Sequence, residues 1–281
     1  MKKILITGAD SYIGTSFTAF VSSRYPGEYS IDTIDMVDGS WRQKSFAGYD
    51  AVFHVAGLAH QRITPEMVDA YYAVNRDLAV ETAKKAKEAG AGQFIFLSSM
   101  SIYGLGTGVI TADTIPTPTN HYGKSKWQAE QGLMPLADDN FTVTVLRPPM
   151  VYGKDCKGNF RTLYRLVEKS PIFPRIHNAR SLLHIDNLSG FVKKCVDERL
   201  SGVYFPQNKE YVDTYMIAEE LAAAMGKKLY FSWLAGLAVS ALRLFLPVAK
   251  KAFGSLIYKD MEVFDFDYCV VDTAESIRKS V

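Results

Sequence analysis

Short apolar runs alternate with longer amphipathic segments over the first half of the chain. The apolar runs have strand length and often end at glycine, serine or proline: residues 2–7, 29–35, 50–57, 93–99 and 141–149. Segments with apolar residues at helical spacing lie between them, at residues 11–25, 68–90 and 124–134. This alternation predicts a parallel sheet covered by helices on both faces. The connection from Asp35 to Tyr49 is too short for a full helical crossover, so we expect one helix to be missing there.

The alternation weakens beyond Pro148, which predicts a change of domain. We expect an α/β fold of the doubly wound, Rossmann type over residues 1–150, to which some later segments return. A smaller α/β lobe is expected over residues 151–281. Internal repeats and low-complexity tracts do not interrupt either part.

The most apolar stretch, WLAGLAVSALRLFLP, occupies residues 233–247. One helical stripe collects its apolar side chains: Leu234, Leu237, Ala238, Ala241 and Phe245. The stretch is shorter than a membrane span, contains Arg243 and stops at Pro247, so no transmembrane segment is expected. A core helix or a partner-facing helix is favoured over membrane contact.

Composition excludes several classes of function. The 281 residues carry a formal charge of only +2 with scattered basic residues, so a nucleic-acid partner is not expected. The three cysteines, Cys156, Cys195 and Cys269, are far apart and show no paired spacing with histidine. This pattern argues against a disulfide framework and against a metal site, and it favours a cytoplasmic location.

The segment TGADSYIG, residues 7–14, follows a predicted strand and opens a predicted helix. Backbone amides and the positive helix end hold a dinucleotide pyrophosphate at such a turn. Gly8 permits the tight turn and Gly14 permits close packing, while Ser11 stands where a middle glycine is usual. Asp35 ends the second predicted strand, where a carboxylate accepts hydrogen bonds from an adenosine ribose and repels a 2′-phosphate. The cofactor is therefore expected to be NAD(H), with NADP(H) as the alternative.

Tyr122 and Lys126 are spaced by one helical turn, so a phenol and an ammonium lie on the same face. The ammonium and the positive charge of an oxidised nicotinamide both favour phenolate, so we expect the pKa of Tyr122 to be lowered. The predicted strand before FLSSMSIYG ends in two serines, at the edge where open α/β sheets present ligands. Ser99 is expected to hold the substrate oxygen whose proton moves.

With these motifs in this order, the chain resembles the extended short-chain dehydrogenase/reductase superfamily, specifically its nucleotide-sugar epimerases, dehydratases and reductases. The resemblance implies a catalytic set of Ser99, Tyr122 and Lys126. It implies cofactor contacts along the first domain, to which Tyr122 and Lys126 also contribute: Gly8, Ser11, Tyr12, Ile13, Gly14, Asp35, Ala56, Gly57, Asn75 and Pro148.

The resemblance also implies a UDP-sugar between the two lobes. KGNF and NARSLLHIDN are similar to segments that hold the diphosphate and uridine, which assigns Asn159 and Arg180 to the substrate. Met150 takes a substrate-facing position at which many relatives carry asparagine. Family members commonly pair through helices like those after Asn75 and Tyr122, so a homodimer is expected.

Several reactions are compatible with this resemblance. The motifs RPPMVYG, KGNF, ARSLLHIDN and FGSLIY are similar to those of capsule and O-antigen enzymes that reduce UDP-4-keto-6-deoxy-N-acetylhexosamines. A UDP-hexose 4-epimerase is the alternative. Dehydration is disfavoured because Met100 and Ser101 stand where dehydratases carry an Asp-Glu pair. A dinucleotide-sensing protein without catalysis and a membrane-associated scaffold using residues 233–246 are hypotheses of other classes.

Overall fold

The computed structural model describes residues 1–59, 64–245, 253–261 and 264–281, and it divides into two compact units. The first unit comprises residues 1–104, 116–148 and 189–206. The second comprises residues 105–115, 149–188 and 207–281. Each unit is described by itself below.

A six-stranded parallel sheet forms the centre of the first unit, in the order β10-β6-β4-β3-β1-β2. Its strands are β1 (Lys2–Thr7), β2 (Tyr29–Ile34), β3 (Ala51–His54), β4 (Gln93–Leu97), β6 (Thr142–Leu146) and β10 (Gly202–Tyr204). The chain moves from β1 outward to β2 and then returns to β3 on the other side of β1, so the order reverses there. Open α/β sheets bind their ligands at such a reversal. The predicted Rossmann-type fold is confirmed.

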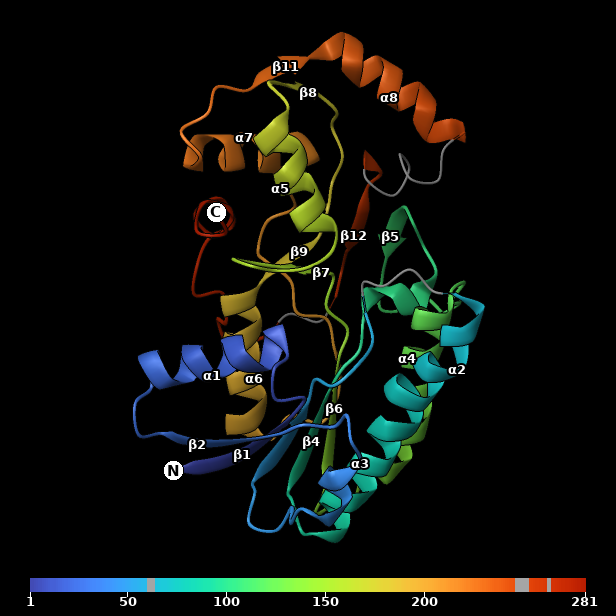
Figure 1. The fold of residues 1–281 in the computed structure, drawn as a ribbon, viewed down its shortest axis with the longest axis vertical. Coiled ribbons are helices and arrows are strands. Elements are labelled where there is room, and N and C mark those ends of the chain that lie inside the picture. Colours follow the sequence, from blue (N-terminus) through green and yellow to red (C-terminus); the bar gives the residue numbers. More distant parts are fainter. Residues whose placement is uncertain (60–63, 246–252, 262–263) are drawn as a thin grey trace. The chain divides into compact units, whose positions relative to one another are not determined.

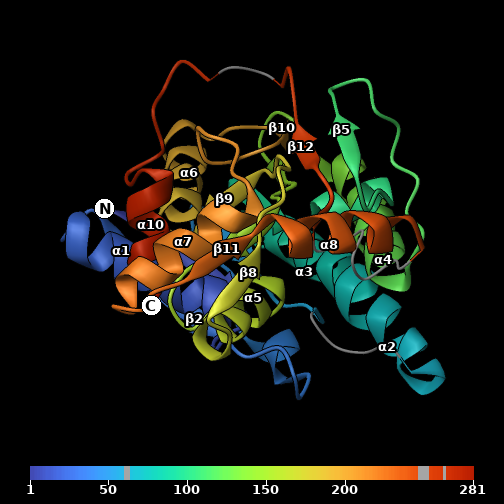
Figure 2. The same cartoon turned by 90° about the horizontal axis from the view of Figure 1, so that it is seen from above.

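Helices cover both faces of this sheet (Figures 1 and 2). One face carries α1 (Tyr12–Arg24) and α6 (Ile185–Glu198), and the other carries α3 (Leu78–Glu88) and α4 (His121–Leu133). The α3 and α4 face encloses a large apolar core, to which alternate strand residues such as Val52, Phe94 and Val143 contribute. Burial on both faces explains the nearly continuous apolar runs in the strands.

The segment predicted as one helix at residues 68–90 is interrupted in its middle. It consists of α2 (Val68–Tyr72), the π-helical turn η3 (Ala73–Asp77) and α3, and the short 3-10 helix η2 (Pro65–Met67) precedes it. A π turn inserts an extra residue into a helix and is found mostly at functional positions. Asn75, at the centre of this turn, is fully buried.

Shorter elements complete the first unit. The connection from β2 to β3 holds the 3-10 helix η1 (Ser40–Gln43), which buries Trp41 instead of forming a full crossover helix. The 3-10 helix η4 (Met100–Tyr103) follows β4, and η5 (Met134–Leu136) continues α4.

The second unit contains three parallel strand pairs in place of one sheet. They are β7 (Met150–Tyr152) with β9 (Leu182–His184), β5 (Gly108–Ile110) with β12 (Leu256–Tyr258), and β8 (Ile172–Pro174) with β11 (Tyr230–Ser232). Within the described residues its helices are α5 (Asn159–Lys169), α7 (Thr214–Ala224), α8 (Trp233–Phe245) and α10 (Thr273–Arg278). A buried hydrogen bond from Asn187 Nδ2 to Val271 O, 3.0 Å, attaches the C-terminal segment to this unit.

The apolar stretch predicted from residue 233 forms α8, which packs beside β8. Within the described ranges, every helix is too short or too polar to cross a bilayer. The interpretation of α8 as a core helix is wrong, because its large apolar side chains are exposed.

Candidate active site

The turn between β1 and α1 lies at the point where the strand order reverses. Gly8 has φ +103°, and a Cβ there would lie 3.0 Å from Ala56 N, so the backbone after β1 approaches the backbone after β3 closely. Gly8 N also donates to Ile34 O at 2.8 Å, one residue before Asp35. The ends of β1, β2 and β3 therefore meet, and they bring together Gly8, Asp35 and Ala56. Asp35 itself is exposed, and its Oδ1 accepts from Val37 N at 3.0 Å.

Ser11 is the N-cap of α1, and its Oγ accepts from Gly14 N at 3.1 Å. A Cβ at Gly14 would lie 2.9 Å from Ile6 Cγ2, so glycine is needed for the close approach of α1 to the sheet. Tyr12 and Ile13 form the first turn, where amides and the helix dipole favour an anion. The serine that departs from the glycine pattern thus has a structural role as a cap.

Asn75 joins the loop after β3 to α4. Its Oδ1 accepts from Leu58 N at 2.8 Å, and its Nδ2 donates to Leu58 O at 3.1 Å and to Ser125 Oγ at 3.2 Å. A Cβ at Gly57 would lie 2.9 Å from Asn75 Oδ1 and 3.4 Å from Lys126 Nζ. Gly57, Asn75 and Lys126 are therefore neighbours in a space that a larger residue at position 57 would fill.

Ser99 and Tyr122 face each other from the end of β4 and the start of α4. Ser99 caps η4, where its Oγ accepts from Ser101 N at 3.1 Å. Asn120 caps α4 by accepting from Gly123 N at 2.8 Å, which fixes Tyr122 in the first turn. Burial raises the pKa of Tyr122, and a hydrogen bond with Ser99 offsets part of this rise.

Lys126 is buried, and its Nζ donates to Leu97 O at 2.8 Å, 4.5 Å from the centroid of the Phe96 ring. Burial lowers the pKa of this ammonium to about 8, while Glu130 acts in the opposite direction. The prediction that Lys126 lowers the pKa of Tyr122 is wrong. The pKa of the phenol is raised, and Ser99 is the neighbour that lowers it in part.

A buried ion pair behind these groups was missed from the sequence. Arg147 Nη2 lies 2.6 Å from Glu130 Oε2, and Arg147 Nη1 donates to Tyr103 Oη at 2.8 Å. Glu130 also accepts from Ser98 Oγ. The spacing contained a signal, because Glu130 lies one turn beyond Lys126 and Arg147 directly precedes Pro148. Pro148 is buried, and its carbonyl accepts from Met100 N at 2.9 Å.

Three residues of the second unit are assigned to the substrate: Met150 and Arg180, which lie on or beside the β7 and β9 pair, and Asn159, which lies on α5. Met150 starts β7 and pairs with Leu182, two residues after Arg180. Arg180 Nη1 donates to Gly254 O at 3.0 Å, and burial lowers the pKa of its guanidinium. Asn159 is exposed at the first turn of α5. His60 follows HVAGLA in the sequence, where we expect it near the nicotinamide, and it lies outside the described residues.

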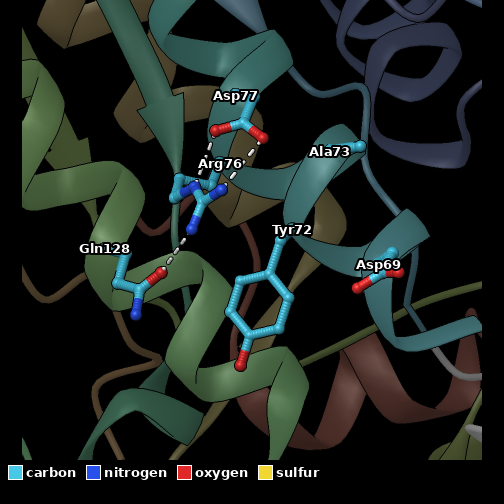
Figure 3. A pocket seen from close by; sticks show the side chains of 6 residues that line it. All are labelled: Asp69, Tyr72, Ala73, Arg76, Asp77 and Gln128. Atoms are coloured by element: carbon cyan, nitrogen blue, oxygen red, sulfur yellow. Dashed lines mark hydrogen bonds and ion pairs between the residues drawn. The ribbon is translucent and has the colours of Figure 1, made fainter. Parts of the chain in front are cut away.

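A depression of about 540 Å³ on the first unit is lined by residues of α2, η3 and α4 (Figure 3). Its six lining residues differ from those assigned to the cofactor and the chemistry: Asp69, Tyr72, Ala73, Arg76, Asp77 and Gln128. Arg76 is already engaged there, because it pairs with Asp77 at 2.6 Å and donates to Gln128 Oε1 at 2.9 Å. The depression is therefore separate from the predicted catalytic set of Ser99, Tyr122 and Lys126.

Comparison with known proteins gives a family match and several relatives. The model of the NAD dependent epimerase/dehydratase family matches residues 4–189. A UDP-glucose 4-epimerase from Vibrio cholerae is 30% identical over 80% of this chain and 76% of its own length. An N-acetyl-alpha-D-glucosaminyl-diphospho-ditrans,octacis-undecaprenol 4-epimerase from Escherichia coli O157:H7 is 26% identical over 80% of this chain and 73% of its own. A UDP-2-acetamido-2,6-beta-L-arabino-hexul-4-ose reductase from Pseudomonas aeruginosa is 26% identical over 71% and 51%.

Solved structures share the fold. A UDP-glucuronic acid 4-epimerase from Bacillus cereus in complex with NAD superposes with a TM-score of 0.71 at 17% identity, covering 99% of this chain and 97% of that one. A dTDP-4-dehydrorhamnose reductase from Bacillus anthracis in complex with NADP has a TM-score of 0.67 at 21% identity, covering 82% and 83%.

Proposed function

Because the chain belongs to the NAD dependent epimerase/dehydratase family, an enzyme family of the extended short-chain dehydrogenase/reductase type, we propose that it moves a hydride at C4 of a UDP-hexose. The observation that carries this proposal is the hydrogen bond between Ser99 and Tyr122 at the carboxyl end of β4. Lys126 is buried one turn further along α4. These groups supply what proton transfer at a carbinol or ketone needs: an acid or base, a hydrogen-bond partner and a nearby cation.

The turn and loop after β1 and β3 fit a nicotinamide cofactor. A Cβ at Gly8 would crowd Ala56 N, and a Cβ at Gly57 would crowd Asn75 Oδ1, so both positions need glycine for the backbone to approach closely. The capped start of α1 directs its amides toward the reversal point. The pyrophosphate would be held by the turn and the first residues of α1: Gly8, Ser11, Tyr12, Ile13 and Gly14. Asp35 would hold the adenosine ribose. Ala56, Gly57, Asn75 and Pro148 would line the remainder of the cofactor site. When bound, the cofactor supplies or accepts the hydride.

We place the reaction in the reducing direction, on the C4 ketone of a UDP-4-keto-6-deoxy-N-acetylhexosamine. Ser99 holds the ketone oxygen, and Tyr122 donates its proton to that oxygen as it becomes a hydroxyl. The hydrogen bond with Ser99, which lowers the pKa of Tyr122 in part, stabilises the phenolate that remains. Met150, Asn159 and Arg180 bind the nucleotide part of the substrate. The product would serve surface-polysaccharide synthesis.

The residues after Ser99 argue against dehydration at this site. Met100 is buried, and Ser101 Oγ accepts from Ser99 Oγ at 3.1 Å. Loss of water across C5 and C6 needs a further acid and base, which these two side chains do not supply.

A 4-epimerase is the second candidate, favoured by the identity to the Vibrio cholerae relative over most of both chains. In this reaction Tyr122 removes the proton of the 4-hydroxyl, and the same proton returns after the ketone turns over. The two reactions use the same side chains. They differ in whether reduced cofactor is consumed.

Absorbance of the reduced nicotinamide separates the candidates. The purified chain is mixed with NADH or NADPH and enzymatically prepared UDP-4-keto-6-deoxy-N-acetylglucosamine, with Tyr122→Phe as the matched inactive variant. Stoichiometric loss of absorbance supports the reductase, and a preference for NADH supports the assignment of Asp35. No loss overturns the reductase.

A second arm supplies NAD⁺ with UDP-N-acetylglucosamine or with its undecaprenyl-diphosphate-linked counterpart, since one relative is named for a substrate of that kind. Interconversion with the galacto epimer establishes an epimerase. If cofactor binds but neither arm shows turnover, a dinucleotide-binding protein without catalysis becomes the better explanation.

A further inference from the structure

The apolar stripe of α8 faces outward. Its exposed fractions are 66%, 62%, 60% and 81% for Trp233, Leu234, Leu237 and Phe245. Gly236 is buried on the opposite side, and a Cβ there would come within 2.4 Å of Arg175 O. The helix therefore approaches the protein closely at Gly236 and presents its large apolar residues to the surroundings, an arrangement typical of an interaction surface.

Exposed apolar side chains also lie on the adjoining strand pair. Tyr230 of β11 lies opposite Ile172 of β8 in the parallel pair, and each is 55% exposed. β11 leads directly into α8, which lies beside β8 in the second unit (Figure 1). We define the α8 patch as the set Ile172, Tyr230, Trp233, Leu234, Leu237 and Phe245.

The stretch of sequence that contains α8 carries basic charge only. Residues 221–259 contain no aspartate or glutamate, and their charged residues are Lys227, Lys228, Arg243, Lys250, Lys251 and Lys259. The whole chain has a formal charge of only +2, so the rest of the sequence is net negative. Lys228 is exposed, and its Nζ stands 5.2 Å from the ring centroid of Tyr230, within the patch. Lys227 Nζ is already bound by the carbonyl oxygens of Val167, Glu168 and Ser170, so Lys228 is the residue that places a cationic group beside the patch among the described side chains.

We propose that the α8 patch docks onto the surface of a membrane that contains anionic lipids. Tryptophan and tyrosine are favoured at the headgroup level, leucine and phenylalanine enter the acyl boundary, and lysine attracts lipid phosphate. At 13 residues, α8 spans only about 20 Å, so it lies along the surface and does not cross it. This inference goes beyond the proposed function and does not depend on which sugar is the substrate.

Sedimentation with vesicles tests the proposal on the full chain. We expect binding to vesicles of equal parts phosphatidylcholine and phosphatidylglycerol, and much weaker binding to phosphatidylcholine alone or at high salt. The double variant Leu234→Glu, Leu237→Glu should lower the lipid partition coefficient by about a hundredfold. The control Ile115→Glu, Leu166→Glu introduces the same charge at two other exposed apolar positions, 76% and 45% exposed, and should bind as the wild type does.

Tryptophan fluorescence reports the contact site independently. Trp233 is exposed, whereas Trp41 is buried and Trp127 is half-buried. Anionic vesicles should therefore shift the emission to shorter wavelength in the wild type, and Trp233→Phe should abolish the shift while vesicle binding largely persists. A shift that survives in Trp233→Phe would contradict contact through α8.

Three outcomes overturn the proposal. The wild type fails to sediment with anionic vesicles, or the Leu234 and Leu237 variant binds them as well as the control does. In the third outcome, sedimentation velocity without lipid shows a dimer that the α8 variant alone dissociates, and vesicles bind neither protein. That result would assign the patch to a second copy of the chain.

Discussion

At the scale of single residues, the phenol of Tyr122 is the group on which the proposed reaction depends. Replacement Tyr122→Phe removes the transferable proton and leaves the ring, so turnover should fall by about 10²–10⁴-fold. Affinity for the cofactor should change little, because the cofactor contacts proposed along β1 and β3 remain.

Stopped-flow turnover together with calorimetric NAD⁺ binding measures both effects. Tyr72→Phe is the matched control, since it removes a phenol on α2 that bonds His121 Nδ1 at 3.1 Å. Equal turnover of Tyr122→Phe and wild type would remove Tyr122 from the chemistry.

Lys126 gives the stability of the protein a defined pH dependence. Burial lowers its pKa to about 8 in the folded protein, whereas a lysine in the unfolded chain titrates near about 10.4. Below pH 8 both states hold the proton, and the folded state bears the full penalty, on the order of 3 kcal/mol. As pH rises above 8, the folded state loses the proton first, so the penalty declines toward zero near the unfolded pKa.

We therefore expect Lys126→Met to be more stable than the wild type near neutral pH and to lose this gain in stability in alkaline solution. The free energy of unfolding of the variant minus that of the wild type should decrease by about 2–3 kcal/mol between about pH 7 and 10. Urea unfolding at a series of pH values measures this difference, in which the other titrating groups cancel. A difference independent of pH would show that the ammonium is not desolvated.

At the scale of elements, the buried pair of Glu130 and Arg147 fastens α4 to the segment after β6. Glu130→Gln leaves Arg147 charged and without its counter-ion, and the loss of one partner of a buried pair costs about 3–5 kcal/mol. The exposed pair of Arg42 and Glu81 provides the matched control, because Glu81→Gln should cost less than about 1 kcal/mol. Chemical denaturation of both variants checks this prediction, and similar costs for the two would contradict it.

The pair of Glu130 and Arg147 also shows which contacts of a helix the sequence pattern could not predict. Helical spacing was sufficient to place Tyr122 and Lys126 on one face of α4, because they share one turn. The partner of Glu130 is Arg147, which comes from the segment after β6, and only the tertiary fold brings it near. The π turn at Asn75 was missed for a related reason, since its side chain is satisfied by Leu58 and Ser125 from distant segments.

At the scale of the whole molecule, ligand binding should stabilise the first unit in particular. All the proposed cofactor residues belong to that unit. NAD⁺ at about a hundred times its Kd contributes about 2.7 kcal/mol, which raises the Tm by about 5–10 °C. NADP⁺ at the same concentration should raise the Tm less than NAD⁺ does. The variant Asp35→Ala should reduce the difference between the Tm values with the two cofactors.

Differential scanning calorimetry measures these shifts. If the two units melt separately, NAD⁺ should move only the transition of the first unit. A larger shift with NADP⁺ than with NAD⁺ would contradict the role proposed for Asp35.

The overall architecture could be predicted where local pattern and tertiary burial agree. Strands such as β1, β3 and β4 are buried on both faces, so their apolar runs and terminal glycine or serine residues were sufficient. The stripe on α8 has the same pattern as a buried helix, and the sequence does not encode which side of a helix meets the protein. In the structure the side with Gly236 faces Arg175, and this contact comes from a segment distant in sequence. The predicted homodimer stays a prediction.

The π turn at Ala73–Asp77 also bears on which changes of length the chain tolerates during evolution. Helix α3 is anchored by the buried residues Ala79, Ala83 and Ala86, so its rotational setting is fixed. Deleting one residue between Asn75 and Leu78 would turn the preceding helix by roughly 100° and carry the amide of Asn75 away from Leu58. We therefore expect related sequences to differ in length at surface loops and to keep the same number of residues in this five-residue turn, even where its amino acids differ.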